Sequence, residues 1–277
     1  MQLLYTSDLH GQYRRYQELR LLIEEHQPDV AILGGDLLPH YGHTQSSIQS
    51  QIQFIKKDLR EFLTNHSHTI PIGFILGNDD WAACLPFLGQ LADEFPIQYL
   101  PENPLIINNT QILGYSYVPP TPFLAKDFDK LDKQNDLAPD YPPLVYISEN
   151  GKIRSKDAAT LLEQRSSMEE DLSKLRAPAD CVFVAHAPPF QTQLDRLESG
   201  QSVGSQSVLN WIKRHRPILS LHGHIHESPK VSGKYWDTIG NTICINPGQA
   251  EDQLCAVIID IDDTIKVQHT VYGEMEL

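Results

Sequence analysis

The chain has 277 residues, 40% of them hydrophobic, and a formal net charge of −14. This length is near the upper limit for one hydrophobic core, and no Gly/Ser-rich or Pro-rich linker divides it, so we expect one domain over 1–277. The acidic excess and the lack of a Lys/Arg cluster argue against long nucleic acid as a partner. The longest apolar runs, such as Leu254–Ile261, are too short to cross a membrane.

The amino terminus and the cysteines predict a cytoplasmic protein. Gln2–Thr6 has the pattern of a strand and lacks the features of a signal peptide. The four cysteines are widely spaced and form no C-x-x-C pair, which predicts reduced thiols and neither a structural zinc site nor a disulfide framework.

The first half alternates apolar strands with amphipathic helices. Strands are predicted at Gln2–Thr6, Asp29–Leu33 and Pro71–Leu76, and helices at Tyr13–His26 and Gln45–Thr64. Each of these strands ends in a polar cluster. Because open α/β sheets place ligands outside the carboxyl ends of their strands, we expect the functional site there.

The second half is richer in strands and predicts a second, largely antiparallel sheet. Its expected strands are Leu105–Tyr117, Ala179–Ala185, Ile218–His222, Thr242–Asn246, Cys255–Asp260 and Ile265–Tyr272. An insert at 119–175 begins with the Pro-, Lys- and Asp-rich segment Pro119–Pro143 and continues into a polar-faced helix near Lys156–Leu175. The insert is either a solvated loop with a surface helix, or a lid that shapes the substrate pocket.

Five short polar motifs follow apolar strands in a fixed order. They are Asp8-Leu9-His10, Gly35-Asp36, Gly77-Asn78, Ala185-His186-Ala187-Pro188-Pro189 and Gly223-His224-Ile225-His226. A D-x-H triplet alone is expected by chance, and G-H-x-H is rarer, but the ordered series makes coincidence implausible. In this order the chain resembles the calcineurin-like metallophosphoesterases, and Asn246-Pro247-Gly248 is also common in that family.

The resemblance implies an α/β fold, a four-layer αββα sandwich with two mixed sheets packed face to face and helices outside. It also implies two divalent metal ions, one held by the residues that match Asp8, His10 and His226, and the other by those that match Asn78, His186 and His224. Asp36 matches the bridging ligand.

Asp, Asn and neutral His suit Mn, Fe or Zn ions better than thiolates would. A hydroxide activated by the two metals would attack a small phosphate ester, with no covalent enzyme intermediate. Two alternatives stay open: a non-catalytic metal-binding scaffold on the same fold, and a metal-dependent nuclease, which a basic groove would favour.

One position departs from the family pattern. Most members have His after the Asn of the third motif, whereas this chain has Asp79. An ionised Asp79 would repel dianionic phosphomonoesters, so we expect phosphodiesters to be preferred; a protonated Asp79 would instead act as a general acid. His40 and His43 follow the bridging Asp36 and are candidates for contact with substrate. His222 is either a partner that orients a metal ligand or an ordinary strand-end residue.

Overall fold

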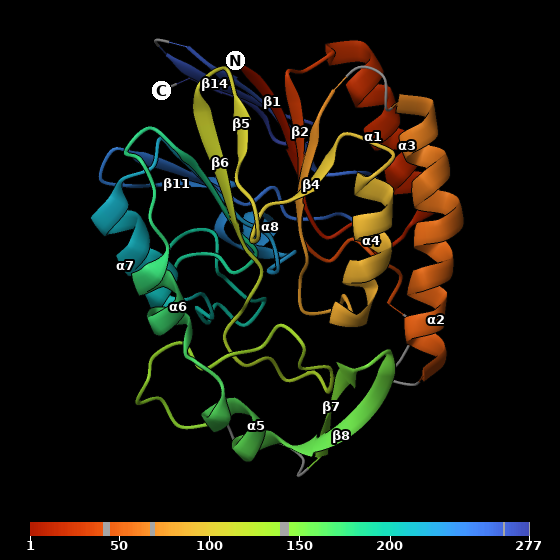
Figure 1. Ribbon diagram of the computed structural model, residues 1–277. Helices are drawn as coiled ribbons and strands as arrows, with labels where there is room; N and C mark the ends of the chain where they lie inside the picture. Colours follow the sequence, from red (N-terminus) through yellow and green to blue (C-terminus); the bar gives the residue numbers. More distant parts are fainter. Residues whose placement is uncertain (41–44, 67–69, 139–143, 263, 277) are drawn as a thin grey trace.

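The computed structural model describes residues 1–40, 45–66, 70–138, 144–262 and 264–276. Two mixed sheets face each other, with helices outside both (Figure 1). The seven-stranded sheet has the order β15 (Gly273–Glu276), β14 (Ile265–His269), β13 (Ala256–Ile261), β1 (Gln2–Thr6), β2 (Val30–Gly34), β3 (Ile72–Ile75), β4 (Ile97–Tyr99). The six-stranded sheet has the order β11 (Trp236–Ile239), β12 (Thr242–Ile245), β10 (Leu219–Leu221), β9 (Val182–Ala185), β6 (Thr110–Tyr115), β5 (Leu105–Ile107).

The apolar residues of the strands fill three layers of core because neighbouring side chains on a strand point to opposite faces. Leu4 of β1 packs in the cluster between the first sheet and its helices, while Leu3 and Tyr5 pack in the cluster between the two sheets. A third cluster lies between the second sheet and its helices and contains Phe183 and Trp211. The expected four-layer αββα sandwich is therefore confirmed.

The described helices over the seven-stranded sheet include the predicted helix Tyr13–His26, the predicted helix Gln45–Thr64 in pieces, and one helix that was not predicted, Leu85–Ala92. They are α1 (Tyr13–His26), α2 (Gln45–Phe54), α3 (Arg60–His66) and α4 (Leu85–Ala92). The predicted helix Gln45–Thr64 is interrupted by one π-helical segment, Ile55–Leu59, which joins α2 to α3. Among the described helices, none combines the length and the apolar character needed to cross a bilayer.

The expected antiparallel character of the second sheet is wrong. β9 pairs in parallel with both β6 and β10, and β10 pairs in parallel with β12. Parallel neighbours need crossover connections, and α7 (Gln206–His215) lies in the connection from β9 to β10. The predicted strand Leu105–Tyr117 is the hairpin β5–β6, which turns at Asn108 and Asn109, both with positive φ.

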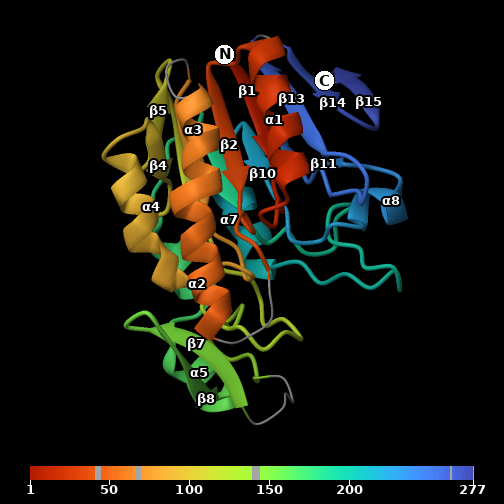
Figure 2. The same cartoon turned by 90° about the vertical axis from the view of Figure 1, so that its right-hand side faces the viewer.

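The insert 119–175 is more structured than expected. It contains the antiparallel hairpin of β7 (Leu144–Glu149) and β8 (Lys152–Asp157), which lies beyond the carboxyl ends of the central strands and beside α2 (Figures 1 and 2). The single helix predicted near Lys156–Leu175 is wrong. Two short helices are present, α5 (Ala158–Gln164) and α6 (Met168–Lys174), and α6 begins with a capping box between Ser167 and Glu170.

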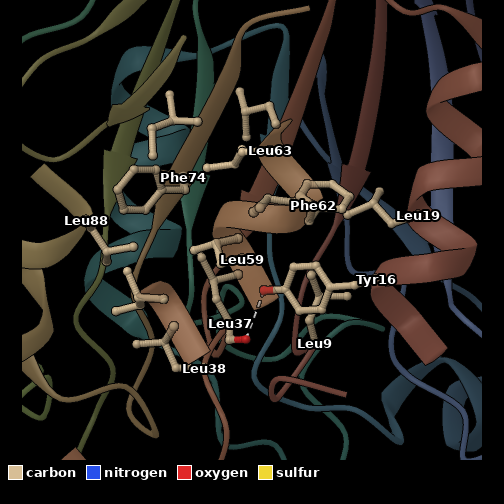
Figure 3. Close-up of a cluster of buried hydrophobic side chains, with 14 of the residues drawn as sticks. Leu9, Tyr16, Leu19, Leu37, Leu38, Leu59, Phe62, Leu63, Phe74 and Leu88 are labelled. Atoms are coloured by element: carbon tan, nitrogen blue, oxygen red, sulfur yellow. Dashed lines mark hydrogen bonds between the residues drawn. The ribbon is translucent and has the colours of Figure 1, made fainter. Parts of the chain in front are cut away.

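The loops that follow β1 and β2 rest on a packed core. The Tyr16 hydroxyl of α1 donates a 3.0 Å hydrogen bond to the carbonyl of Leu37, amid the buried side chains of Leu9, Leu38 and Phe62 (Figure 3). Because Leu37 directly follows Asp36, this hydrogen bond helps to fix the position of the loop that carries Asp36 after β2.

His269 at the end of β14 predicts a pH-dependent stability. Its side chain is buried, Nδ1 accepts hydrogen bonds from the backbone of Val271 and Tyr272, and Nε2 donates to Pro247. Burial lowers the pKa of His269 to about 4. In the unfolded chain its pKa is about 6.5, so protons bind preferentially to the unfolded state and stability falls as the pH drops from that value toward the folded pKa.

We expect His269 to account for a loss of about 2 kcal/mol in the free energy of unfolding between pH 7 and pH 5. Urea unfolding at both pH values measures it in the wild type and in His269→Gln, whose amide does not titrate. The loss should be smaller in the variant by that amount. An equal loss in both proteins would contradict the assignment.

Candidate metal centre

The site is built where the loops after β1 and β2 pair with each other. The backbone N–H of Asp8 donates to Gly35, and that of His10 donates to Asp36, at 2.9 and 2.8 Å. Asp8, His10, Asp36 and His224 all have positive φ, between 49° and 67°. Non-glycine residues rarely adopt this conformation, and it persists only where the surrounding structure imposes it, often at functional sites.

One group of possible metal donors comprises Asp8, His10, Asp36 and His226, whose ligand atoms lie within 4.8 Å of one another. His226 Nε2 lies 3.0 Å from Asp8 Oδ1 and 3.3 Å from His10 Nε2. The backbone N–H of His224 contacts both carboxylate oxygens of Asp8 at 3.2 Å. The first and last motifs, more than 200 residues apart, therefore meet at Asp8.

A second group contains Asp36, His186 and His224. His186 Nε2 lies 3.2 Å from Asp36 Oδ2, and His186 Nδ1 donates to the carbonyl of Gly34 at 2.8 Å, which fixes the orientation of the ring. Asp36 belongs to both groups, the arrangement that a bridging carboxylate requires.

Asn78 is the remaining predicted ligand. Its side-chain oxygen is buried and accepts no hydrogen bond from the part of the chain that the structure describes, while its amide nitrogen contacts Asp79 at 3.2 Å. An unpaired buried acceptor is costly unless another partner, such as a cation, occupies it. Together with the carboxylates and imidazoles of the two groups, this amide oxygen makes a donor set that fits two divalent ions.

The buried charges depend on one another. Burial alone would raise the pKa of Asp36, but His186 and His10 lower it to about 2. Burial likewise opposes protonation of His186, yet Asp36 and Asp8 raise its pKa to about 10. Burial and the charge of His186 lower the pKa of His224 to about 3. A divalent cation would replace the proton of His186, because histidine binds metals as the neutral imidazole.

The predicted substrate-contacting residues lie beside this cluster. Asp79 Oδ2 is 3.3 Å from His40 Nδ1 and 3.6 Å from His10 Nδ1, and the backbone N–H of Asp79 donates to Asp36 at 2.8 Å. The side chain of His40 is 40% exposed, so solvent and substrate can reach it. His43 lies outside the described residues.

Asp80 is a residue beside the candidate centre that the sequence analysis did not single out. It is buried, and its carboxylate accepts hydrogen bonds from the backbone of Leu37, Leu38 and Gly77 at 2.8–3.1 Å. These bonds tie the loop after β2 to the loop after β3, and so hold Asp36 and Asn78 together. The adjacent acids Asp79 and Asp80 were visible in the sequence, but the sequence does not indicate which of the two carboxylates is buried.

Two more residues support the histidine loops. The Asn246 amide donates to the carbonyls of Gly223 and Ile225, on either side of His224. His222 is buried, and its Nδ1 lies 3.0 Å from the carbonyls of both Ala185 and Ala187, which flank His186. His222 therefore supports a predicted ligand through the backbone, without contacting the ligand side chain.

A sequence model described as calcineurin-like phosphoesterase matches residues 1–228. The chain belongs to the calcineurin-like phosphoesterase family, as its motif order predicted. Members depend on two metal ions, and the protein is accordingly a metal-dependent phosphoric ester hydrolase. A comparison with curated protein sequences found no significant match.

Solved structures confirm the fold. A dimetal phosphatase from Danio rerio is 9% identical, with a TM-score of 0.59 over 100% of this chain and 98% of that one. A protein of Thermus thermophilus is 17% identical, with a TM-score of 0.51 over 92% of this chain and 93% of that one. At such low identity these similarities establish the architecture alone.

Proposed function

We propose that the protein hydrolyses small phosphodiesters in preference to phosphomonoesters, using two divalent ions held by seven side chains. The proposed ligands are Asp8, His10 and His226 for one ion, Asn78, His186 and His224 for the other, and Asp36 as the bridge. The observation that carries this proposal is that two groups of donors share Asp36. Two bound ions supply a hydroxide nucleophile near neutral pH and neutralise charge on the phosphoryl group.

Turnover on a substrate panel tests the proposal. Manganese is the ion to load first, because the oxygen and imidazole donors suit it. The loaded protein is given a phosphomonoester, a phosphodiester, cyclic nucleotides and a nucleoside diphosphate ester, and we expect metal-dependent hydrolysis with the diester fastest. Long duplex DNA in the same assay tests the nuclease alternative. A protein that carries two ions yet cleaves nothing would favour the scaffold alternative.

The preference for diesters rests on Asp79. Burial and the charges of Asp36 and Asp80 raise the pKa of Asp79 to about 8, whereas cations bound at Asp36 act in the opposite direction by favouring the carboxylate. A carboxylate about 5 Å from the phosphate, at an effective dielectric near 20, costs roughly 3 kcal/mol per extra unit of substrate charge. Metals and solvent screen this repulsion, so the figure is an upper limit.

Asp79→Asn and Asp79→His should therefore both raise the rate on a monoester relative to that on a diester with the same leaving group. Steady-state kinetics of the manganese-loaded variants measure this ratio. If Asp79→Asn leaves the ratio unchanged and slows only esters with poor leaving groups, Asp79 is a proton donor instead. His40, whose ring nitrogen is close to Asp79, is proposed to contact the same phosphate oxygens.

Three further assignments belong to this proposal. The chain is taken as one domain, in which the insert 119–175 shapes the substrate pocket without binding the metals. Loop inserts beside a site commonly set specificity on a shared scaffold. A cytoplasmic location is supported by the four cysteines, all of which are buried, free thiols.

A further inference from the structure

A pocket of about 290 Å³ adjoins the candidate metal centre. Asp36, Asn78 and His224 line it on the side of the metal donors. The remaining lining comes largely from two loops that carry no proposed ligand. The pocket therefore extends beyond the space that a phosphoryl group occupies, into a region where an ester substituent would lie.

The wall of this extension is apolar. The insert contributes Pro119, Pro120, Pro122 and Phe123, and a second loop contributes Leu197 and Val203. Phe123 is 47% exposed, although phenylalanine is among the residue types most often buried. An exposed ring beside prolines in a concave site is a surface on which a flat apolar group can pack.

The insert wall is held rigidly. Thr121 donates through its backbone N–H and its hydroxyl to Asp129, at 2.7 and 2.9 Å. Lys126 donates to the same Asp129 oxygen at 2.8 Å and to the Thr121 carbonyl at 3.1 Å, and both charged side chains are fully buried. Prolines on either side of Thr121 further restrict the backbone. A preformed wall loses little entropy when a ligand binds, which strengthens binding.

The charges at the pocket restrict its ligand further. Among the described residues that line it there is no lysine or arginine, whereas Glu227 and Asp79 contribute carboxyl groups. The buried Lys126 is engaged with Asp129 and does not line the pocket. A substituent that carries its own phosphate or carboxylate would meet no lysine or arginine among these described residues and would be repelled by Glu227.

We propose that this pocket selects phosphate diesters in which one ester substituent is uncharged and aromatic, and that Phe123 is the residue that recognises it. The proposal rests on the proposed function, since the phosphate must lie at the metal pair. It adds the chemical class of the substituent and assigns a specificity role to a residue that is not among the proposed metal ligands.

Three phosphonate monoesters test the proposal, because the phosphonate group of each carries one negative charge and the tested substituent is joined to phosphorus by a P–C bond, which ester hydrolysis does not break. They are methyl phenylphosphonate, methyl methylphosphonate and methyl 4-carboxyphenylphosphonate, each titrated calorimetrically into manganese-loaded protein. The phenyl compound should bind about tenfold more tightly than the methyl compound, the effect of burying roughly 60 Å² of apolar surface. The carboxyphenyl compound should lose this advantage.

Phe123→Ala should reduce the advantage of the phenyl compound at least threefold and leave binding of the methyl compound unchanged. Leu137→Ala is the matched control, because Leu137 lies in the same insert, is 90% exposed and does not line the pocket. If the methyl and phenyl compounds bind equally well, or Phe123→Ala has no effect, the selectivity is wrong while the proposed function stands. If metal-loaded protein binds neither compound and cleaves no ester, both proposals fail.

Discussion

Asp36→Asn should remove both metal ions and almost all activity. Asp36 is only 2% exposed and belongs to both groups of donors, and the substitution replaces a bridging anion with a neutral amide. We expect metal affinity to fall by more than a hundredfold, since even residues that only support a ligand change affinity by about 10- to 100-fold. Metal analysis after dialysis against limiting manganese measures the number of ions per chain. The rate of diester hydrolysis is then measured on the same samples.

Asp260→Asn makes the same chemical change far from the centre. Asp260 lies on β13, and its carboxylate accepts a hydrogen bond from the side chain of Gln2, at the opposite end of β1 from Asp8. The Asp260→Asn protein should therefore keep the metal content and the activity of the wild type. An Asp36→Asn protein that still binds two ions with wild-type affinity would show that Asp36 is not the bridge.

The strands that carry the site could be predicted from the sequence. β1, β2, β3, β9 and β10 are short apolar runs, each followed within a few residues by a polar motif. For β1, β2 and β3 the convergence was predictable because parallel strands end at the same edge of a sheet. The parallel pairing of β9 with β10 was not predicted, and the order of motifs, which identified the family, brought their histidines to the same site. The resemblance supplied the pairing of the two sheets, which periodicity alone does not determine.

The insert could not be predicted with equal success, for physical reasons. Because Lys126 and Asp129 are charged, the sequence predicts that their side chains are exposed to solvent. Only the tertiary structure shows that they are buried against each other. The break between α5 and α6 had a visible signal, because Ser167 and Glu170 have the S-x-x-E spacing of a capping box. Asp80 illustrates another limit: its role depends on backbone groups that come from two separate loops.

Gly77→Ala should disrupt the centre without changing any proposed ligand. A β-carbon at Gly77 would lie 2.2 Å from Asp36 Oδ1 and 2.5 Å from His186 Nε2, far inside van der Waals contact. Because Gly77 precedes Asn78, relieving the clash must displace side chains from both groups of donors. We expect about 1–3 kcal/mol of destabilisation, the usual cost of overpacking a filled interior, together with loss of tight metal binding.

Gly89→Ala separates this steric effect from the general effect of replacing glycine. Gly89 lies within α4, and a β-carbon there would meet no atom within 4 Å. Alanine at such a helical position should stabilise the protein by about 0.5–1 kcal/mol. Urea unfolding of the metal-free proteins and manganese titrations of both variants test the two expectations. If Gly77→Ala binds two ions as tightly as Gly89→Ala, the loops after β2 and β3 can move apart, and the close approach at Gly77 is not what positions the ligands.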